Sequence, residues 1–382
     1  MAKKRKQHFV PQMYLKRFAD KDGLIDLYHI QQASCYKKIS YKDQCKRSYF
    51  YGADLEWENR LCSMEREWHS LFSNIDKRSH LTDEDINQIK MFALYQRQRT
   101  YGEYSYRYDE RTQLYELYAR ELYAHNGWEF DDEAKRQIKE SVNQSISPSE
   151  MLELAHNLQK YIVDLDVRII EYSTSNSFII SDVPVIAINP FHMPSIGYGC
   201  VGLVILFPVS PKVLVVIYDS KMYKLNGSDR YIVSNNEDEV VAINNLQYVS
   251  ADEILLGNEC DFPKTDNELN KARSISRDGE SITRLGSEDN PLWVMGMRKT
   301  IYTCDLSFAH VNHSFRRIPF ICREGVPRIW DEAWEIKLKN KAKILCDIYS
   351  LTPEKFQGYT SKEIRDGCNR FYRQMMKYWS CK

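Results

Sequence analysis

The sequence has no apolar run long enough to cross a membrane. A membrane-spanning helix needs about 18 or more consecutive apolar residues, whereas the best run here, at 201–209, has the length of a strand. The basic cluster that begins at Lys3 is not followed by an apolar segment, so we expect no secretory signal. We therefore predict a folded, cytoplasmic protein that makes no contact with the membrane.

Closely spaced cysteine pairs are also missing. The ten cysteines are scattered along the chain, and no two of them form a C-x-x-C pair. A chain of 382 residues can bury a core without covalent cross-links, and structural zinc sites need closely spaced ligand pairs. We therefore expect reduced thiols, most of them packed as small apolar groups, and no paired-cysteine zinc site.

Three widespread catalytic signatures have no counterpart here. The chain contains no G-x-x-x-x-G-K-[ST], no G-x-G-x-x-G directly after a predicted strand and no G-x-S-x-G. These patterns mark P-loop nucleotide hydrolysis, Rossmann dinucleotide binding and serine-hydrolase chemistry. None of those three activities is therefore supported by a motif.

The formal net charge is zero, but the charges are unevenly placed. Residues 1–52 carry 12 Lys and Arg against 4 Asp and Glu, and residues 325–382 carry 12 against 7. Basic segments of this kind attract polyanions such as nucleic acid. They can equally attract the acidic middle of the same chain or remain solvated, so charge alone leaves nucleic-acid binding open.

Hydrophobic periodicity predicts an α+β fold. Residues 1–165 are mainly helical in pattern, with clear helix starts at Thr82 and at Ser147. Short β-branched runs follow and predict a mixed or antiparallel sheet within 166–260, at 167–172, 178–180, 185–188, 201–207 and 213–218. The polar stretch 261–291 is typical of a loop or linker, and 292–382 is expected to be mostly helical. We expect the helical half to pack on the sheet as one unit.

Several segments carry a resemblance to a known family. They are, in chain order, His8-x-x-Pro11-Gln12-x-Tyr14-Leu15-x-x-Phe18, then Glu58 and Glu65, Gln96 with Arg99-Thr100, Ser181-Asp182-Val183-Pro184-Val185, and Phe207-Pro208-Val209-Ser210-Pro211. Together they resemble the bacterial domain-of-unknown-function family 4238 over roughly residues 7–255. Val183 and Val209 depart from the usual Asn and Leu of that family. Members occur among anti-phage defence genes, so the resemblance implies a defence role and no particular chemistry.

The matched positions supply a candidate site. Its candidate catalytic residues are His8, Gln12, Glu58, Glu65, Arg99 and Asp182. Glu58 and Glu65 are seven residues apart, two turns on one helix face, so both can point at a common site. Without a metal, His8 is a candidate general base and Arg99 a group that stabilises developing negative charge.

A divalent metal is the other chemical hypothesis. Glu65 and His69 lie one helical turn apart and, with Asp182, are candidate ligands. An imidazole with carboxylates suits Mn²⁺, Fe²⁺ or Zn²⁺, and carboxylates alone suit Mg²⁺. We expect Mg²⁺ or Mn²⁺ if a metal is bound, where it would activate water to attack a phosphodiester.

Each of these residues also has a purely structural interpretation. His8 can cap the helix that starts near Pro11, Glu65 can pair with a local arginine, and Asp182 can close an Asx-turn between two strands. A stripe of tyrosines adds a further ambiguity; its members are Tyr101, Tyr104, Tyr108, Tyr115 and Tyr118. Such a stripe can pack in the core, form a protein interface or stack on nucleic-acid bases.

Two functions follow as hypotheses. The first is an anti-phage effector that stops phage growth, by abortive infection if it kills the infected cell, and that acts as a metal-dependent nuclease on RNA or DNA. The alternative is a non-enzymatic sensor or interaction module that binds a phage protein or a partner subunit, including a second copy of this chain.

Overall fold

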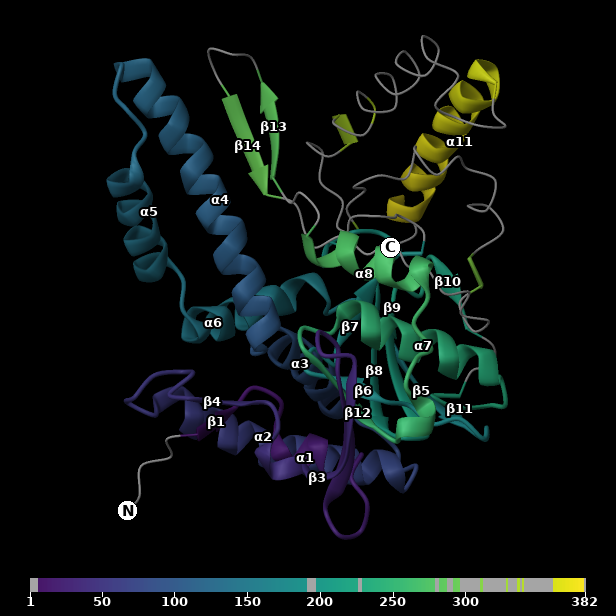
Figure 1. The fold of residues 1–382 in the computed structure, drawn as a ribbon. Coiled ribbons are helices and arrows are strands. Elements are labelled where there is room, and N and C mark those ends of the chain that lie inside the picture. The colour runs from purple at the N-terminus through teal and green to yellow at the C-terminus, as the bar shows by residue number, and fades with distance from the viewer. Residues whose placement is uncertain are drawn as a thin grey trace.

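The computed structural model describes residues 6–190, 197–225, 229–278, 282–286, 291–295, 310–311, 328, 335–336, 339 and 360–380 (Figure 1). The chain folds as α+β, as predicted. The helices of the first half are α1 (Gln12–Leu15), α2 (Glu56–Asp76), α3 (Asp83–Gln98), α4 (Tyr101–Asn126), α5 (Asp132–Ser145) and α6 (Pro148–Leu158).

Local signals in the sequence account for where these helices begin. Thr82 forms a capping box with Asp85 at the start of α3, and Ser147 caps α6 with Pro148 in its first turn. The side chain of Thr100 accepts a hydrogen bond from the amide of Glu103 and starts α4 immediately after α3 ends. The chain therefore bends sharply at Arg99 and Thr100, and α4 extends away from the sheets beside α5 (Figure 1).

The two largest sheets among the described residues have five and four strands. A five-stranded mixed sheet has the order β11-β5-β9-β8-β7, in which only the β11–β5 pair is parallel. Its strands are β5 (Asp166–Tyr172), β7 (Ile186–Ile188), β8 (Val204–Ser210), β9 (Val213–Tyr218) and β11 (Tyr231–Ser234). Strands β8 and β9 are almost entirely apolar because both faces of this sheet are covered, as their continuous Val, Ile and Leu runs predict.

Residues 1–165 are mainly helical, as predicted, but two strands from this half also join a second sheet. Its order is β3-β2-β12-β6, so two N-terminal strands pair with strands from much later in the chain. The strands are β2 (Leu24–His29), β3 (Ser34–Ser40), β6 (Ile180–Ser181) and β12 (Ile254–Gly257). A separate short ladder joins β1 (Lys6–His8) to β4 (Lys46–Ser48). The alternation of apolar residues in the sequence could indicate β2, but it could not indicate that β2 pairs with β12, about 230 residues later in the chain.

The main core lies between the helices and the five-stranded sheet. Phe92 of α3 is at its centre, with ring centroids 4.9 Å from Phe72, 5.2 Å from Trp68 and 5.2 Å from Phe207 of β8. Tyr14 of α1 packs on the same ring at 5.4 Å, and its hydroxyl donates to the carbonyl of Pro208. The segment that contains Tyr14 and the segment that contains Phe207 and Pro208, both part of the family resemblance, thus contact each other in the core.

The prediction that residues 261–291 form a loop or linker is wrong. In the described part of that stretch there are α8 (Asn267–Asp278), β13 (Ile282–Gly286) and the start of β14 (Pro291–Met295), which pairs with β13 beside α4.

Tertiary packing explains why α8 forms from so polar a sequence. Two of its apolar side chains, Leu269 and Ala272, are buried against Tyr248 and Val249 of α7 (Glu237–Ser250). Arg273 donates to the carbonyls of Tyr248 at 2.9 Å and Asp252 at 2.8 Å. These contacts come from outside the segment, so its own composition did not reveal them.

The C-terminal helix predicted at 361–379 is confirmed as α11 (Ser361–Ser380). Within the same region, the sequence pattern also predicts a strand at 316–322 and a helix at 331–349. The first lies outside the described residues, as does nearly all of the second. Among the helices that the structure describes, none is both long enough and apolar enough to span a bilayer.

The tyrosine stripe on α4 is largely packed inside. Tyr104, Tyr108 and Tyr115 lie against a small core built from Ile138 and Val142 of α5. The core interpretation is therefore confirmed for these three residues. Tyr118 is 61% exposed, so the far end of α4 keeps an open aromatic surface.

Candidate functional site

Four predicted site residues meet where β1, α1, α2 and the end of α3 converge. His8 ends β1, Gln12 begins α1, Glu65 lies in the middle of α2, and Arg99 is the residue that ends α3. Tyr51, from the loop before α2, completes the group through its hydroxyl. We call these five residues the His8 cluster.

Arg99 is the hub of the His8 cluster. Its side chain is 1% exposed, and its Nη2 lies 2.8 Å from a carboxylate oxygen of Glu65 and 2.8 Å from the carbonyl oxygen of His8. Its Nε lies 3.2 Å from the hydroxyl of Tyr51. Its Nη1 is buried and has no hydrogen-bond partner among the described residues. Burial by itself lowers the pKa of this guanidinium, but Tyr51 and Glu65 raise it above its ordinary value, so Arg99 is a permanent cation.

His8 is half-buried, and its Nε2 has two polar neighbours. Its Nε2 lies 3.0 Å from the carbonyl oxygen of Lys42 and 3.3 Å from the side-chain nitrogen of Gln12. Burial lowers the pKa of His8, and the cations Lys46 and Arg99 lower it further, against the opposing effects of the Lys42 carbonyl and Glu65. The imidazole is therefore neutral at pH 7, the state in which it can accept a proton.

Tyr51 was not found by reasoning from the sequence. Its hydroxyl lies 3.2 Å from the carbonyl oxygen of Arg99 and 3.4 Å from that of His8, and burial raises its pKa to about 12. The buried side chain of Gln7 fixes the loop by accepting from the Tyr51 amide at 2.7 Å and donating to the Gly52 carbonyl at 3.0 Å. A lone tyrosine in a polar loop has no sequence signature, although Gln7 directly precedes the matched motif.

The loop that carries Tyr51 is conformationally strained. Cys45, Tyr49 and Leu55 all have positive φ angles, of 51°, 51° and 64°, although none of them is glycine. Gly52, with φ at 112°, occupies a conformation that favours glycine. Non-glycine residues with positive φ are uncommon and tend to gather at functional sites, so this strain points to the same region as the His8 cluster.

Glu58 lies near the His8 cluster without a central place in it. It is part-exposed and lies two turns before Glu65 on α2. The negative charges of Glu65 and Glu58 both raise the pKa of Tyr51. The predicted common face of Glu58 and Glu65 therefore exists, but the contact with Arg99 comes from Glu65.

Asp182 is engaged elsewhere, in the turn between β6 and β7. Its carboxylate accepts hydrogen bonds from the amides of Asp252 and Glu253, both at 2.7 Å, and from that of Ile254 at 3.3 Å. Burial and the nearby Asp252 raise its pKa to about 6 in spite of these bonds. Asp182 thus ties the β6–β7 turn to the end of α7, and none of these bonds reaches the His8 cluster.

The predicted metal ligands are not grouped. His69 lies one turn beyond Glu65 but is exposed, the Glu65 carboxylate is paired with Arg99, and Asp182 is bonded to backbone amides. Within the ranges that the structure describes, no three His, Cys, Asp or Glu side chains are placed to hold a metal ion.

Comparison with known proteins identifies one match. A family model described as "Protein of unknown function (DUF4238)" covers residues 6–261. This range includes the His8 cluster and both sheets, and it ends before α8. Searches of curated proteins and of solved structures found no match.

Proposed function

Because the chain belongs to the DUF4238 family of proteins of unknown function, we propose from the His8 cluster, and from the defence association of that family, that it is a bacterial anti-phage effector. In this proposal it hydrolyses phosphodiester bonds of RNA or DNA, with His8 as the general base. One observation carries the proposal: a neutral, part-exposed imidazole is fixed by Gln12 and the Lys42 carbonyl beside a buried cation.

The roles of the residues follow from their charge. Neutral His8 takes a proton from water or from a ribose hydroxyl as that oxygen attacks phosphorus. Arg99 is too deeply buried to bind a phosphate directly; it adds to the lowering of the His8 pKa, which burial mainly causes, and it holds the peptide carbonyl of His8 in place. Glu65 balances the charge of Arg99. Arg99 and Glu65 are thus positioning residues.

The surface around His8 suits a polyanion. Lys46, which pairs with Asp43, lies opposite His8 in the β1–β4 ladder, and Lys6, two residues before His8, lies on the same face. Arg47 lies opposite the buried Gln7, on the other face. Cations on adjacent strands contact the phosphate backbone without regard to sequence. This supports nucleic acid, rather than a small neutral molecule, as the substrate.

The test is cleavage of labelled single- and double-stranded RNA and DNA by the purified protein. Wild-type protein should cut at least one of them, and His8→Gln, which keeps a donor for the Lys42 carbonyl, should lose at least about a hundredfold in rate. His80→Gln, a change at an exposed histidine outside the site, is the matched control. Retention of full activity by His8→Gln would refute the role of His8.

The same assay tests the predicted Mg²⁺ or Mn²⁺, which stays a prediction. Acid–base catalysis by His8 alone should persist in EDTA and in His69→Gln. A metal held by Glu65 and His69 predicts loss of cleavage in both conditions and recovery of the wild-type enzyme on addition of Mn²⁺.

The competing function, a non-enzymatic interaction module, has one feature in its favour. Tyr118 and Leu122 on α4 and Trp128 just beyond it are 61%, 43% and 59% exposed, an apolar surface at the far end of the long helix. Exposed aromatic clusters are enriched in protein interfaces. If no nucleic acid is cut and phage protection survives His8→Gln but not Trp128→Ala, this alternative holds.

A further inference from the structure

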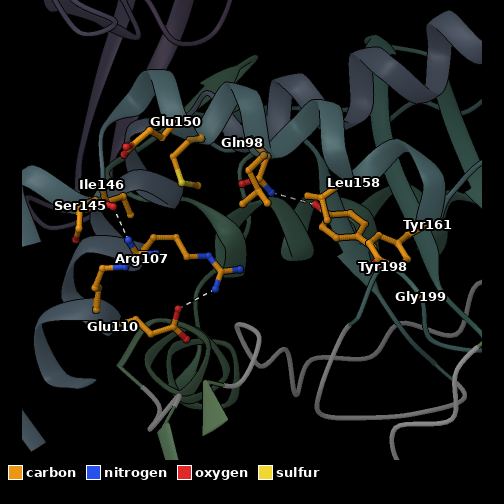
Figure 2. A pocket seen from close by; sticks show the side chains of 13 residues that line it. Gln98, Arg107, Glu110, Ser145, Ile146, Glu150, Leu158, Tyr161, Tyr198 and Gly199 are labelled. Atoms are coloured by element: carbon orange, nitrogen blue, oxygen red, sulfur yellow. Dashed lines mark hydrogen bonds and ion pairs between the residues drawn. The ribbon is translucent and has the colours of Figure 1, made fainter. Parts of the chain in front are cut away.

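A cavity of about 650 Å³ opens beside the α3–α4 bend, next to Gln98 (Figure 2). Its walls come from α4, from α6 with the segment before it, and from the segment around Tyr198. Cavities of this volume are typical of small-molecule sites. The residues of the His8 cluster do not line it, so what it binds is independent of the chemistry at His8.

Gln98 places an unpartnered polar atom in this cavity. Its side chain belongs to a residue that is 2% exposed, and its Nε2 donates to the hydroxyl of Tyr198 at 3.4 Å. Its Oε1 is buried and has no hydrogen-bond partner within the described part of the chain. Since the hydroxyl can donate or accept, either orientation of the amide leaves one polar atom of Gln98 without a partner among the described residues. A buried polar atom without a partner is costly, and a ligand that pairs with it would remove that cost.

Arg107 lies opposite Gln98 across the cavity (Figure 2). Its Nε lies 3.3 Å from Glu103 and its Nη1 lies 2.8 Å from Glu110, two carboxylates whose side chains are 3% and 1% exposed. The guanidinium is thereby held rigidly, and its Nη2 remains available to the cavity. Because two carboxylates already surround this cation, a bare anion such as phosphate has little to gain here.

Much of the rest of the lining is apolar, and Arg111, Ser145 and Glu150 add polar groups to it. The buried ring of Tyr198 and the side chains of Met151 and Leu158 contribute to it, and Tyr161, which is 36% exposed, lies at the rim. Aromatic and aliphatic walls favour a planar ring. The part of the ligand that packs on these apolar side chains should therefore be flat and uncharged, with hydrogen-bonding groups along one edge.

We propose that this cavity binds the base of a nucleoside or mononucleotide. A nucleobase has a planar apolar face, and its edge carries both donors and acceptors of hydrogen bonds. One edge group would pair with the free polar atom of Gln98, and an acceptor on the same edge would take the Nη2 hydrogens of Arg107. Sugar and any phosphate would extend towards the rim.

The test is binding to the full-length protein of adenosine, guanosine, cytidine and uridine, and of their 5′-monophosphates, by calorimetry and thermal shift. At least one nucleoside should bind and raise the melting temperature by mass action. Gln98→Met, which keeps the length of the side chain, should weaken that binding by about tenfold or more. It should not lower the melting temperature of the free protein, because it removes an unsatisfied buried atom.

Two further variants complete the design. Gln88→Met, on the part of α3 where Gln88 pairs with Glu84, is the matched control and should bind as the wild type does. Leu154→Trp fills the cavity from a position that is 38% exposed and should block binding without disturbing the core.

Three results would each overturn the proposal. The first is that none of the eight compounds binds. The second is that inorganic phosphate stabilises the protein as much as a monophosphate does, which would indicate an anion site. The third is that both Gln98→Met and Leu154→Trp leave binding intact.

Discussion

Glu65→Gln should destabilise the folded protein far more than its place on a largely exposed helix suggests. Glu65 is the anionic partner of Arg99, whose side chain is 1% exposed. The other contacts of that guanidinium, the His8 carbonyl and the Tyr51 hydroxyl, are neutral. The substitution therefore leaves a buried positive charge with no carboxylate to balance it.

The structure sets the size of this effect. Removal of one partner from a buried ion pair costs about 3–5 kcal/mol. The Glu65 side chain is 22% exposed and glutamine keeps an oxygen that can accept from Nη2, so we expect a cost below that range, about 2–3 kcal/mol. Glu67→Gln, the same change at an exposed position on the same helix, should cost no more than about 0.5 kcal/mol.

Urea unfolding followed by tryptophan fluorescence would measure both variants, since Trp68 on the same helix is fully buried. The double variant Glu65→Gln/Arg99→Met should be less destabilised than the sum of the two single variants, because the second change removes the stranded charge. Equal stability of Glu65→Gln and Glu67→Gln, or strict additivity in the double variant, would refute the argument that this ion pair holds the site together.

Three other predictions follow from the structure. Gly102→Ala should destabilise the protein by about 1–3 kcal/mol in thermal or urea unfolding, although alanine normally stabilises a helix, because the new Cβ would lie 2.9 Å from the Cβ of Asp252 and 3.0 Å from Val183. The pKa of Asp182, raised to about 6 by burial, means that the folded state binds this proton more tightly than the unfolded state, so its titration lowers stability as pH rises from about 4 to about 6. Asp182→Asn lacks this titration. The difference in unfolding free energy between wild type and variant should therefore narrow as pH rises across that window, and a constant difference would contradict the raised pKa of Asp182. Finally, since the pKa of His8 is lowered, kcat/KM for cleavage should rise with pH through an apparent pKa below 6.5 and be level by pH 7, and a midpoint above 6.5 would rule out neutral His8 as the base.

Local interactions determined much of the fold from the sequence alone. The Thr82 capping box, the Ser147–Pro148 start and the amphipathic spacing of α2 each act within a few residues, and the three helices that they predict are present. The apolar runs of β5, β8 and β9 indicated a buried sheet for the same reason. The resemblance to a family, carried by segments in the right order, is likewise a property of the sequence.

Tertiary structure alone decided which of the matched residues meet. His8, Gln12, Glu65 and Arg99 come together with Tyr51, whereas Asp182 is bonded to the amides that follow α7. Both outcomes depend on contacts between residues 34 to 91 positions apart, and no local pattern encodes such contacts. The same reason explains why α8 was mistaken for a loop, since its stability comes from α7. The cavity at Gln98 is a further case, because its walls belong to helices and a loop that only the folded chain brings together.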